Sequence, residues 1–218
     1  TIMASATRFA GSELWIPVTK PATKTITAVT KANPAVVSVS THGFAAGDIV
    51  YIGAVTGMPE FPAGWYWVGA PAAGTFTINL DTTAYVAAGT GGSVQPYTWQ
   101  KMCEAKNFNS SNSARPEIDT TGMCDSSTTF ESGVTSLGTV TVSGNKLPQG
   151  VVQKALRGYE ATGETFPVKV NFPSPATNGA YYVPVFVQNL NWQGAVNGVW
   201  TLDGTFKKAA AEVFFIPA

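Results

Sequence analysis

Few residues in this sequence could carry out catalysis or bind a metal, and they lie far apart. The chain has one histidine, His42, and two cysteines, Cys103 and Cys124. A Ser-His-Asp or Cys-His arrangement would have to be built on His42 alone. A zinc site takes about four nitrogen or sulfur ligands, and these three residues come from distant segments. We therefore expect His42 to lie in a turn between strands, and we expect no metal and no other cofactor.

The cysteines and one pair of carboxylates have structural interpretations as well as chemical ones. We expect each thiol to be buried among apolar side chains, with a disulfide between Cys103 and Cys124 as the alternative. Glu117 and Asp119 would share one face of any strand through Ile118, so an acid–base pair can be imagined. No nucleophile or base accompanies them, and we expect them to be solvated or to lie at an interface. The sequence thus predicts a protein that is not an enzyme.

Charge and hydropathy limit the classes of partner. The 218 residues include 13 Lys and Arg and 13 Asp and Glu, giving a formal net charge of +0. Binding a phosphate backbone by bulk charge needs clustered cations, so a DNA-gripping domain is disfavoured. Charged residues make up 12% of the chain and hydrophobic ones 44%, against roughly 25% charged in ordinary domains. Much of the surface is therefore expected to meet other protein.

No targeting or membrane segment is expected. The longest apolar stretches, such as the one from Tyr181 to Val187, fall short of the roughly 20 residues that cross a bilayer. The sequence that begins with Thr1 and Ile2 lacks a basic region followed by an apolar one. We expect synthesis inside a cell and no membrane insertion.

The composition predicts a mostly β fold with one helix. The 22 glycines and 14 prolines, together with abundant Thr and Val, are typical of short strands and tight turns. The helix is expected at about 148–158, with Pro148 near its first turn and Gly158 near its end. The period-2 pattern from Phe166 to Phe172 predicts a half-buried strand, and Asp203-Gly204 predicts a two-residue hairpin turn.

A change in composition predicts two domains. Residues 22–95 have few charges, and we expect them to form a small β-barrel module inserted into a discontinuous β-sandwich core of residues 1–21 and 96–218. Strands of this module are expected at residues 25–29, 35–40, 48–52, 65–68 and 75–80, each bounded by turn-forming residues. The polar stretch from Asn107 to Arg115 is expected to be an exposed loop.

Residues 25–80 resemble a small β module that recurs in phage virion proteins and is related in pattern to the first catalytic-cysteine half-domain of ubiquitin-activating enzymes. The resemblance rests on four blocks in order: His42-Gly43-Phe44, Gly47 to Ile52, Val55 to Met58 and Thr75 to Ile78. The ubiquitin chemistry does not carry over, because the segment has no cysteine.

The remainder resembles the major tail tube protein of long, non-contractile-tailed (siphovirus-type) phages. The residues that carry this resemblance are Glu117 to Asp125, Phe130 to Gly133, and Gly138 to Asn145 leading into the one helix. It implies a structural virion protein, made in the host cytoplasm, whose six-membered rings stack into a tube that carries DNA to the host. Its implied partners are other copies, a tape measure protein in the lumen, tail terminator and distal tail proteins at the ends, and double-stranded DNA in transit.

Two sets of residues are candidate contact sites. The polar loop and residues 1–12 are expected to contact the next ring, because segments that order on assembly suit that role; the loop candidates are Phe108, Asn109, Ser110, Ser111, Asn112 and Arg115. We expect the 22–95 module to face outward. The alternative function is a virion surface adhesin or carbohydrate-binding tail module that uses Trp65 and Trp67, although alternate aromatic residues there could instead pack the module's core.

Overall fold

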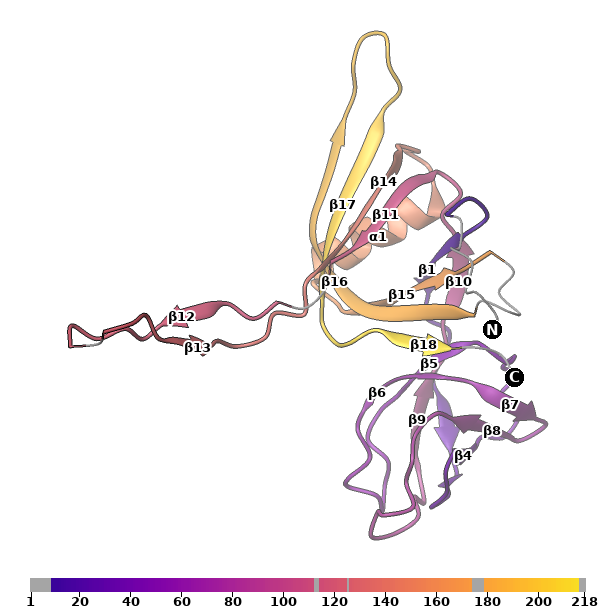
Figure 1. The fold of residues 1–218 in the computed structure, drawn as a ribbon. Helices are drawn as coiled ribbons and strands as arrows, with labels where there is room; N and C mark the ends of the chain where they lie inside the picture. Colours follow the sequence, from indigo (N-terminus) through magenta and orange to yellow (C-terminus); the bar gives the residue numbers. More distant parts are fainter. Residues whose placement is uncertain (1–8, 112–113, 125, 174–178, 216–218) are drawn as a thin grey trace, which may run out of the picture. The chain divides into compact units, whose positions relative to one another are not determined.

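The computed structural model describes residues 9–111, 114–124, 126–173 and 179–215. These residues form strands β1 to β18 and one helix, α1 (Figure 1). The expected mostly β fold with one helix is confirmed. Within the described residues no helix is long and apolar enough to cross a membrane.

The chain divides into two compact units. Unit 1 comprises Thr1–Lys101, Lys169–Tyr182 and Val213–Ala218, and unit 2 comprises Met102–Val168 and Val183–Glu212. Strands β15 (Phe166–Asn171) and β16 (Ala180–Gln193) each contribute residues to both units. The division therefore does not follow the order of the chain.

Unit 1 contains two four-stranded antiparallel sheets made entirely of residues between 22 and 95. One has the order β2 (Lys24–Ile26), β9 (Gly92–Gln95), β5 (Ile49–Ile52), β6 (Gly64–Trp67); the other has the order β3 (Ala28–Val29), β4 (Ala35–Ser38), β8 (Thr75–Ile78), β7 (Gly69–Ala72). Alternate residues of β4 and β8 are buried, as a two-layer packing requires. They join one hydrophobic cluster that includes Val37, Ile52, Met58, Phe76 and Val94. The strands expected at 35–40, 48–52, 65–68 and 75–80 correspond to β4, β5, β6 and β8, whereas the one expected at 25–29 is two strands, β2 and β3, and the short β7 and β9 were not predicted.

The remaining strands of unit 1 pair around β1 (Glu13–Thr19). This strand pairs antiparallel with β10 (Thr98–Lys101) on one side and with Lys169 to Asn171 of β15 on the other. The first residues of β16, Ala180 to Tyr182, pair with β18 (Val213–Phe215). Glu13 joins three strands, because its carboxylate accepts hydrogen bonds from Lys101 at 2.9 Å and from Asn171 at 3.4 Å.

Unit 2 consists of an antiparallel sheet and helix α1, which packs on the sheet through the apolar side chains of the helix. Its strand order is β11 (Ala105–Ser110), β14 (Thr139–Asn145), β17 (Thr201–Lys208), then the later part of β16. Helix α1 (Val151–Thr162) buries Val152, Leu156 and Tyr159. The ring of Tyr159 stacks on Phe166 with centroids 4.1 Å apart, and Phe166 meets Phe206 of β17 edge to face at 6.1 Å. These aromatic contacts fix the helix to β15 and β17.

The expected helix is confirmed, with its ends shifted along the chain: α1 begins three residues later than 148 and continues past Gly158 to Thr162, and Gly163, with a positive φ of 67°, closes it. The predicted hairpin turn in unit 2 was wrong. Asp203-Gly204 is not a hairpin turn but lies inside β17; the chain reverses between Gln193 and Thr201 instead. Gly204 is required there for close packing, since a Cβ atom at this position would lie 2.8 Å from the Phe206 ring.

The expectation for the cysteines was also wrong. Cys103 and Cys124 are both exposed, and both are free thiols. Neither lies in an apolar strand segment: Cys103 follows the end of β10, and Cys124 is in a turn. A thiol in such a turn has no apolar neighbours to bury it.

Candidate functional site

One exposed segment of unit 2 is a hairpin that we call the arm, residues 116–134. Its strands β12 (Glu117–Asp119) and β13 (Phe130–Ser132) pair only with each other. Figure 1 shows them as a narrow ribbon with no other element beside it. A bridge between Ala114 and Ser136 closes its base, as does a 2.8 Å hydrogen bond from Arg115 Nε to Thr135 Oγ1.

The arm carries apolar side chains but has no core of its own. Ile118 is 51% exposed and Phe130 is 56% exposed, while Met123 and Val134 are almost fully exposed. Ile118 lies opposite Glu131 and Phe130 lies opposite Asp119, so neither apolar residue faces another across the ladder. An isolated two-stranded hairpin is marginal in water and needs a further surface to pack on. The arm therefore has the properties of a segment that binds protein.

Polar contacts hold the arm in shape. The backbone N–H of Thr120 donates to the carbonyl of Thr129 at 2.9 Å, and that of Thr129 donates to the hydroxyl of Thr121 at 3.0 Å. The hydroxyl and the backbone N–H of Thr121 both donate to Asp119, which lowers the pKa of that carboxyl. Asp119 therefore stays ionised in the exposed ribbon.

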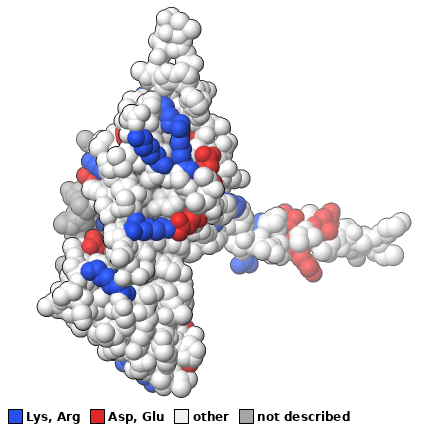
Figure 2. Space-filling model, turned by 180° about the vertical axis from the view of Figure 1, so that it is seen from behind, with Lys and Arg blue, Asp and Glu red and all other residues white. Residues whose placement is uncertain are grey.

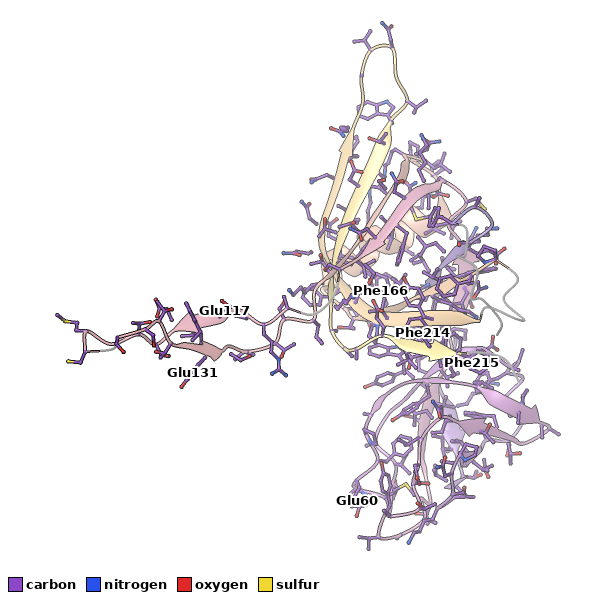
Figure 3. All side chains as sticks on the ribbon, viewed as in Figure 1. Glu60, Glu117, Glu131, Phe166, Phe214 and Phe215 are labelled. Atoms are coloured by element: carbon purple, nitrogen blue, oxygen red, sulfur yellow. The ribbon has the colours of Figure 1, made fainter. Side chains whose placement is uncertain are left out.

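The charges of the arm have one sign. Its described residues include Glu117, Asp119 and Glu131 and no lysine or arginine. Figure 2 shows acidic side chains along the arm and basic ones at its base. Glu117 and Glu131 extend from opposite sides of the ribbon (Figure 3), as residues one step apart in a ladder must. Each face of the arm thus presents a carboxylate beside an apolar residue.

A second exposed apolar surface of unit 2 lies at the end of the β16–β17 hairpin. Trp192 is 58% exposed and Trp200 is 55% exposed, and their ring centroids are 5.6 Å apart. Arg157 of α1 lies over the Trp192 ring, 5.9 Å from its centroid. Further exposed apolar residues of the hairpin end and of the chain entering α1 are Leu147, Val151, Val196 and Val199.

The predicted contact loop is only partly a loop. Phe108, Asn109 and Ser110 belong to β11 and pair with Val142, Thr141 and Val140 of β14. The sequence signal was misleading because the polar residues of β11 alternate on its exposed side. Ser111 follows the strand and its hydroxyl accepts from Thr139 N at 2.7 Å.

The other predicted contact residues have varied positions. Arg115 lies at the base of the arm, 2.8 Å from Thr135 Oγ1, whereas Asn112 and residues 1–8 lie outside the described residues. The projecting segment is the arm that follows. Glu117 and Asp119 of the arm were expected to be solvated or to lie at an interface, but the hairpin itself was not predicted. The available signal for a hairpin was a pair of short Thr-containing runs, at residues 119–121 and 128–130, with the turn-forming Gly122 between them.

The aromatic residues proposed for glycan binding mostly pack inside unit 1. Trp67 is 3% exposed, stacks on Phe215 at 4.9 Å and meets Tyr182 edge to face at 5.2 Å. Trp65 is half-buried against Tyr51, and its Nε1 donates to Tyr97 Oη at 3.3 Å. The Trp67 ring therefore has no exposed face on which a sugar could stack, whereas Trp65 is partly exposed.

His42 has a structural role in the described turn. It is 4% exposed; its Nδ1 accepts from the Phe44 backbone N–H at 3.0 Å, and Nε2 lies 2.6 Å from the Ala72 carbonyl. These partners assign the proton to Nε2. Among the residues that the structure describes, no three His, Cys, Asp or Glu side chains gather in a way that could hold a metal ion.

Comparisons with known proteins complete the description. No protein-family model and no curated protein matches this sequence. One similar solved chain comes from the tail of an empty gene transfer agent particle computed with helical refinement in C6 symmetry; it has a TM-score of 0.42 and 17% identity and covers 54% of this chain and 86% of that one. Another comes from the virion of a native gene transfer agent particle, with a TM-score of 0.41, 17% identity and coverage of 54% and 88%.

Proposed function

We propose that this protein is a structural subunit of a phage-type tail, and that its copies join through the arm into stacked rings that form a tube. The arm carries this proposal, because Ile118 and Phe130 remain about half exposed on a ribbon that has nothing to pack on within its own unit. A surface on another copy would supply the missing partner. The two free edges of the ribbon would be covered by the same contact.

The finer parts of the proposal follow from the resemblance of the sequence to tail tube proteins of siphovirus-type phages. We propose six copies in each ring, a lumen through which double-stranded DNA passes, a tape measure protein in that lumen during assembly, and terminator and distal tail proteins at the ends. The near absence of net charge suits a conduit, since strong cationic binding would hold the DNA in place. Localisation would be the virion.

We further propose that residues 22–95 form an inserted module that faces outward from the tube. Its two sheets close around one hydrophobic cluster drawn entirely from residues 26–94. This is the property of a segment that folds around a core of its own. A module of about 70 residues on the inner side would obstruct a channel for DNA.

Electron microscopy tests the assembly proposal. Concentrated purified protein, alone or with the other tail components, should show rings or tubes in negative stain, and end-on class averages count the copies in each ring. A variant in which Pro116 is joined to Gly133 by a short turn should remain monomeric. This join is feasible because Gly133 N already donates to the Pro116 carbonyl at 2.8 Å. Wild-type protein that stays monomeric under all these conditions would refute the proposal.

A further inference from the structure

Positive charge is left unpaired beside the apolar hairpin end of unit 2. Lys146 is 9% exposed, and burial together with the positive charge of Arg157 lowers its pKa. Within the part of the chain that the structure describes, neither Lys146 nor Arg157 belongs to an ion pair. An ammonium without a counter-ion is stabilised when a carboxylate is brought to it.

Apolar residues lie next to the two residues that carry these charges. The Lys146 backbone N–H donates to the Trp200 carbonyl at 2.7 Å, and the Arg157 guanidinium lies over Trp192. Leu147 and Val151 are about half exposed where the chain enters α1. We call this surface the Lys146 patch: Lys146, Leu147, Val151, Arg157, Trp192 and Trp200. Its exposed part combines an aromatic ring with a cation, a combination that fits an apolar group next to an anion.

The arm presents the complementary combination. On one of its faces Ile118 lies directly opposite Glu131, and on the other Phe130 lies directly opposite Asp119. Residues directly opposite in an antiparallel ladder have Cβ atoms about 5 Å apart. This spacing is comparable to the 5.9 Å between the Arg157 guanidinium and the centre of the Trp192 ring. One carboxylate and one apolar group of the arm can therefore meet one cation and one ring of the patch together.

We propose that one face of the arm of a second copy of this chain docks on the Lys146 patch, with the carboxylate of that face at Lys146 or Arg157 and the apolar side chain beside it on Trp192. The inference rests on the proposed function, because it assigns the acceptor surface for the arm in the assembly. Such a contact is head-to-tail, since the arm and the patch are different surfaces of one chain. Repetition of a head-to-tail contact builds rings or open stacks rather than closed dimers.

Carbodiimide crosslinking tests which surfaces meet. This reagent joins a carboxylate to a lysine amine only when they are in contact, and equal amounts of unlabelled and ¹⁵N-labelled protein distinguish links between copies from links within one copy. We expect mixed-isotope peptides that join Glu117, Asp119 or Glu131 to Lys146. Links from these carboxylates to other lysines, or links from Lys146 to another segment of the second copy, would show a different occupant and overturn the proposal.

Charge substitution tests the contribution of the contact. Arg157→Glu should raise the critical concentration for assembly by at least about tenfold, and the milder Arg157→Gln should raise it by about threefold. Neither substitution should change the melting temperature. Adding Glu131→Arg to Arg157→Glu in the same chain should recover most of the loss. Lys106→Glu changes net charge equally at another exposed position of unit 2 and serves as the control.

The outcomes separate this inference from the proposed function. If the wild type forms tubes and the Arg157→Glu variant assembles normally, the proposed tail function is retained, but the Lys146 patch is not the acceptor of the arm. Absence of any wild-type assembly and of any mixed-isotope crosslink would remove both.

Discussion

The double substitution Ile118→Thr with Phe130→Thr should weaken assembly and leave the fold unchanged. Full burial of such a side chain contributes about 1.5–3 kcal/mol. In the single copy Ile118 is 51% and Phe130 is 56% exposed, so each has about half of that contribution left to gain on docking. Ile118 and Phe130 lie on opposite faces of the arm, so one docked face would supply about 1 kcal/mol. Because about 1.4 kcal/mol changes an equilibrium constant tenfold, the critical concentration should rise about fivefold.

The same exposure predicts a small effect on folding. Substitution of an already exposed side chain changes stability by at most about 0.5 kcal/mol, or about 1–2 °C in melting temperature for a chain of this size. Threonine retains a high preference for strands, so the ladder between β12 and β13 should persist.

Sedimentation of assembled protein over a dilution series measures the critical concentration, and circular dichroism measures the melting temperature. Val86→Thr, which alters an 82% exposed residue in unit 1, is the matched control and should change neither quantity. A critical concentration that stays within about threefold of the wild-type value would refute the inference that the arm binds protein. A fall of more than about 5 °C in melting temperature would show that the arm contributes to the fold of the single copy.

Other predictions concern the stability of each unit and are checked by urea unfolding. In unit 2, the Lys208 side chain is 4% exposed and its ammonium lies 2.7 Å from the Glu212 carboxylate. Glu212→Gln should therefore lower the free energy of unfolding by about 2 kcal/mol in the wild type, but by under about 0.5 kcal/mol in a Lys208→Met background. Equal losses in the two backgrounds would contradict the pairing. Burial opposes ionisation of Glu212, but hydrogen bonds from Lys208 and Ser110 outweigh it and lower its pKa. This stability is present above the ordinary carboxyl pKa of about 4.5 and is lost as the pH falls through the lowered value, so urea midpoints should fall below about pH 4.5. Gly204→Ala should destabilise by about 1–3 kcal/mol, because its Cβ would lie 2.8 Å from the buried Phe206 ring, whereas Gly158→Ala has open space in α1 and should stabilise by about 0.5–1 kcal/mol.

The strands with one buried and one exposed face were predictable from the sequence. In β15 the structure buries Phe166, Val168 and Val170 as the pattern predicts, although Pro167 on the other face is buried as well. The helix was predictable from its apolar stripe, but its ends were not, because α1 has no side-chain cap at its start and passes through Gly158. Burial of one face of a strand or helix produces the periodic pattern of apolar residues, so such segments can be recognised in the sequence.

The candidate site lacked this signal. Every residue of β12 and β13 is exposed, so neither strand has a buried face to produce alternation. The opposite error occurred at β11, where polar side chains on the exposed side of a paired strand resembled a loop. Trp67 was considered for the surface although it is buried, because a tryptophan serves a core and a binding face equally well. Such distinctions depend on neighbours distant in the chain.

The closed base of the arm has a consequence for how this protein could vary. Because the bridge between Ala114 and Ser136 and the hydrogen bond from Gly133 to Pro116 fasten both ends, residues can be added or removed in matched pairs without altering the sheet behind them. Each pair changes the reach of the ribbon by about 3.4 Å. One pair also turns Ile118 to the opposite side, whereas two pairs restore it. Spacing between subunits could therefore be adjusted in steps of about 7 Å while the same side chains face the partner.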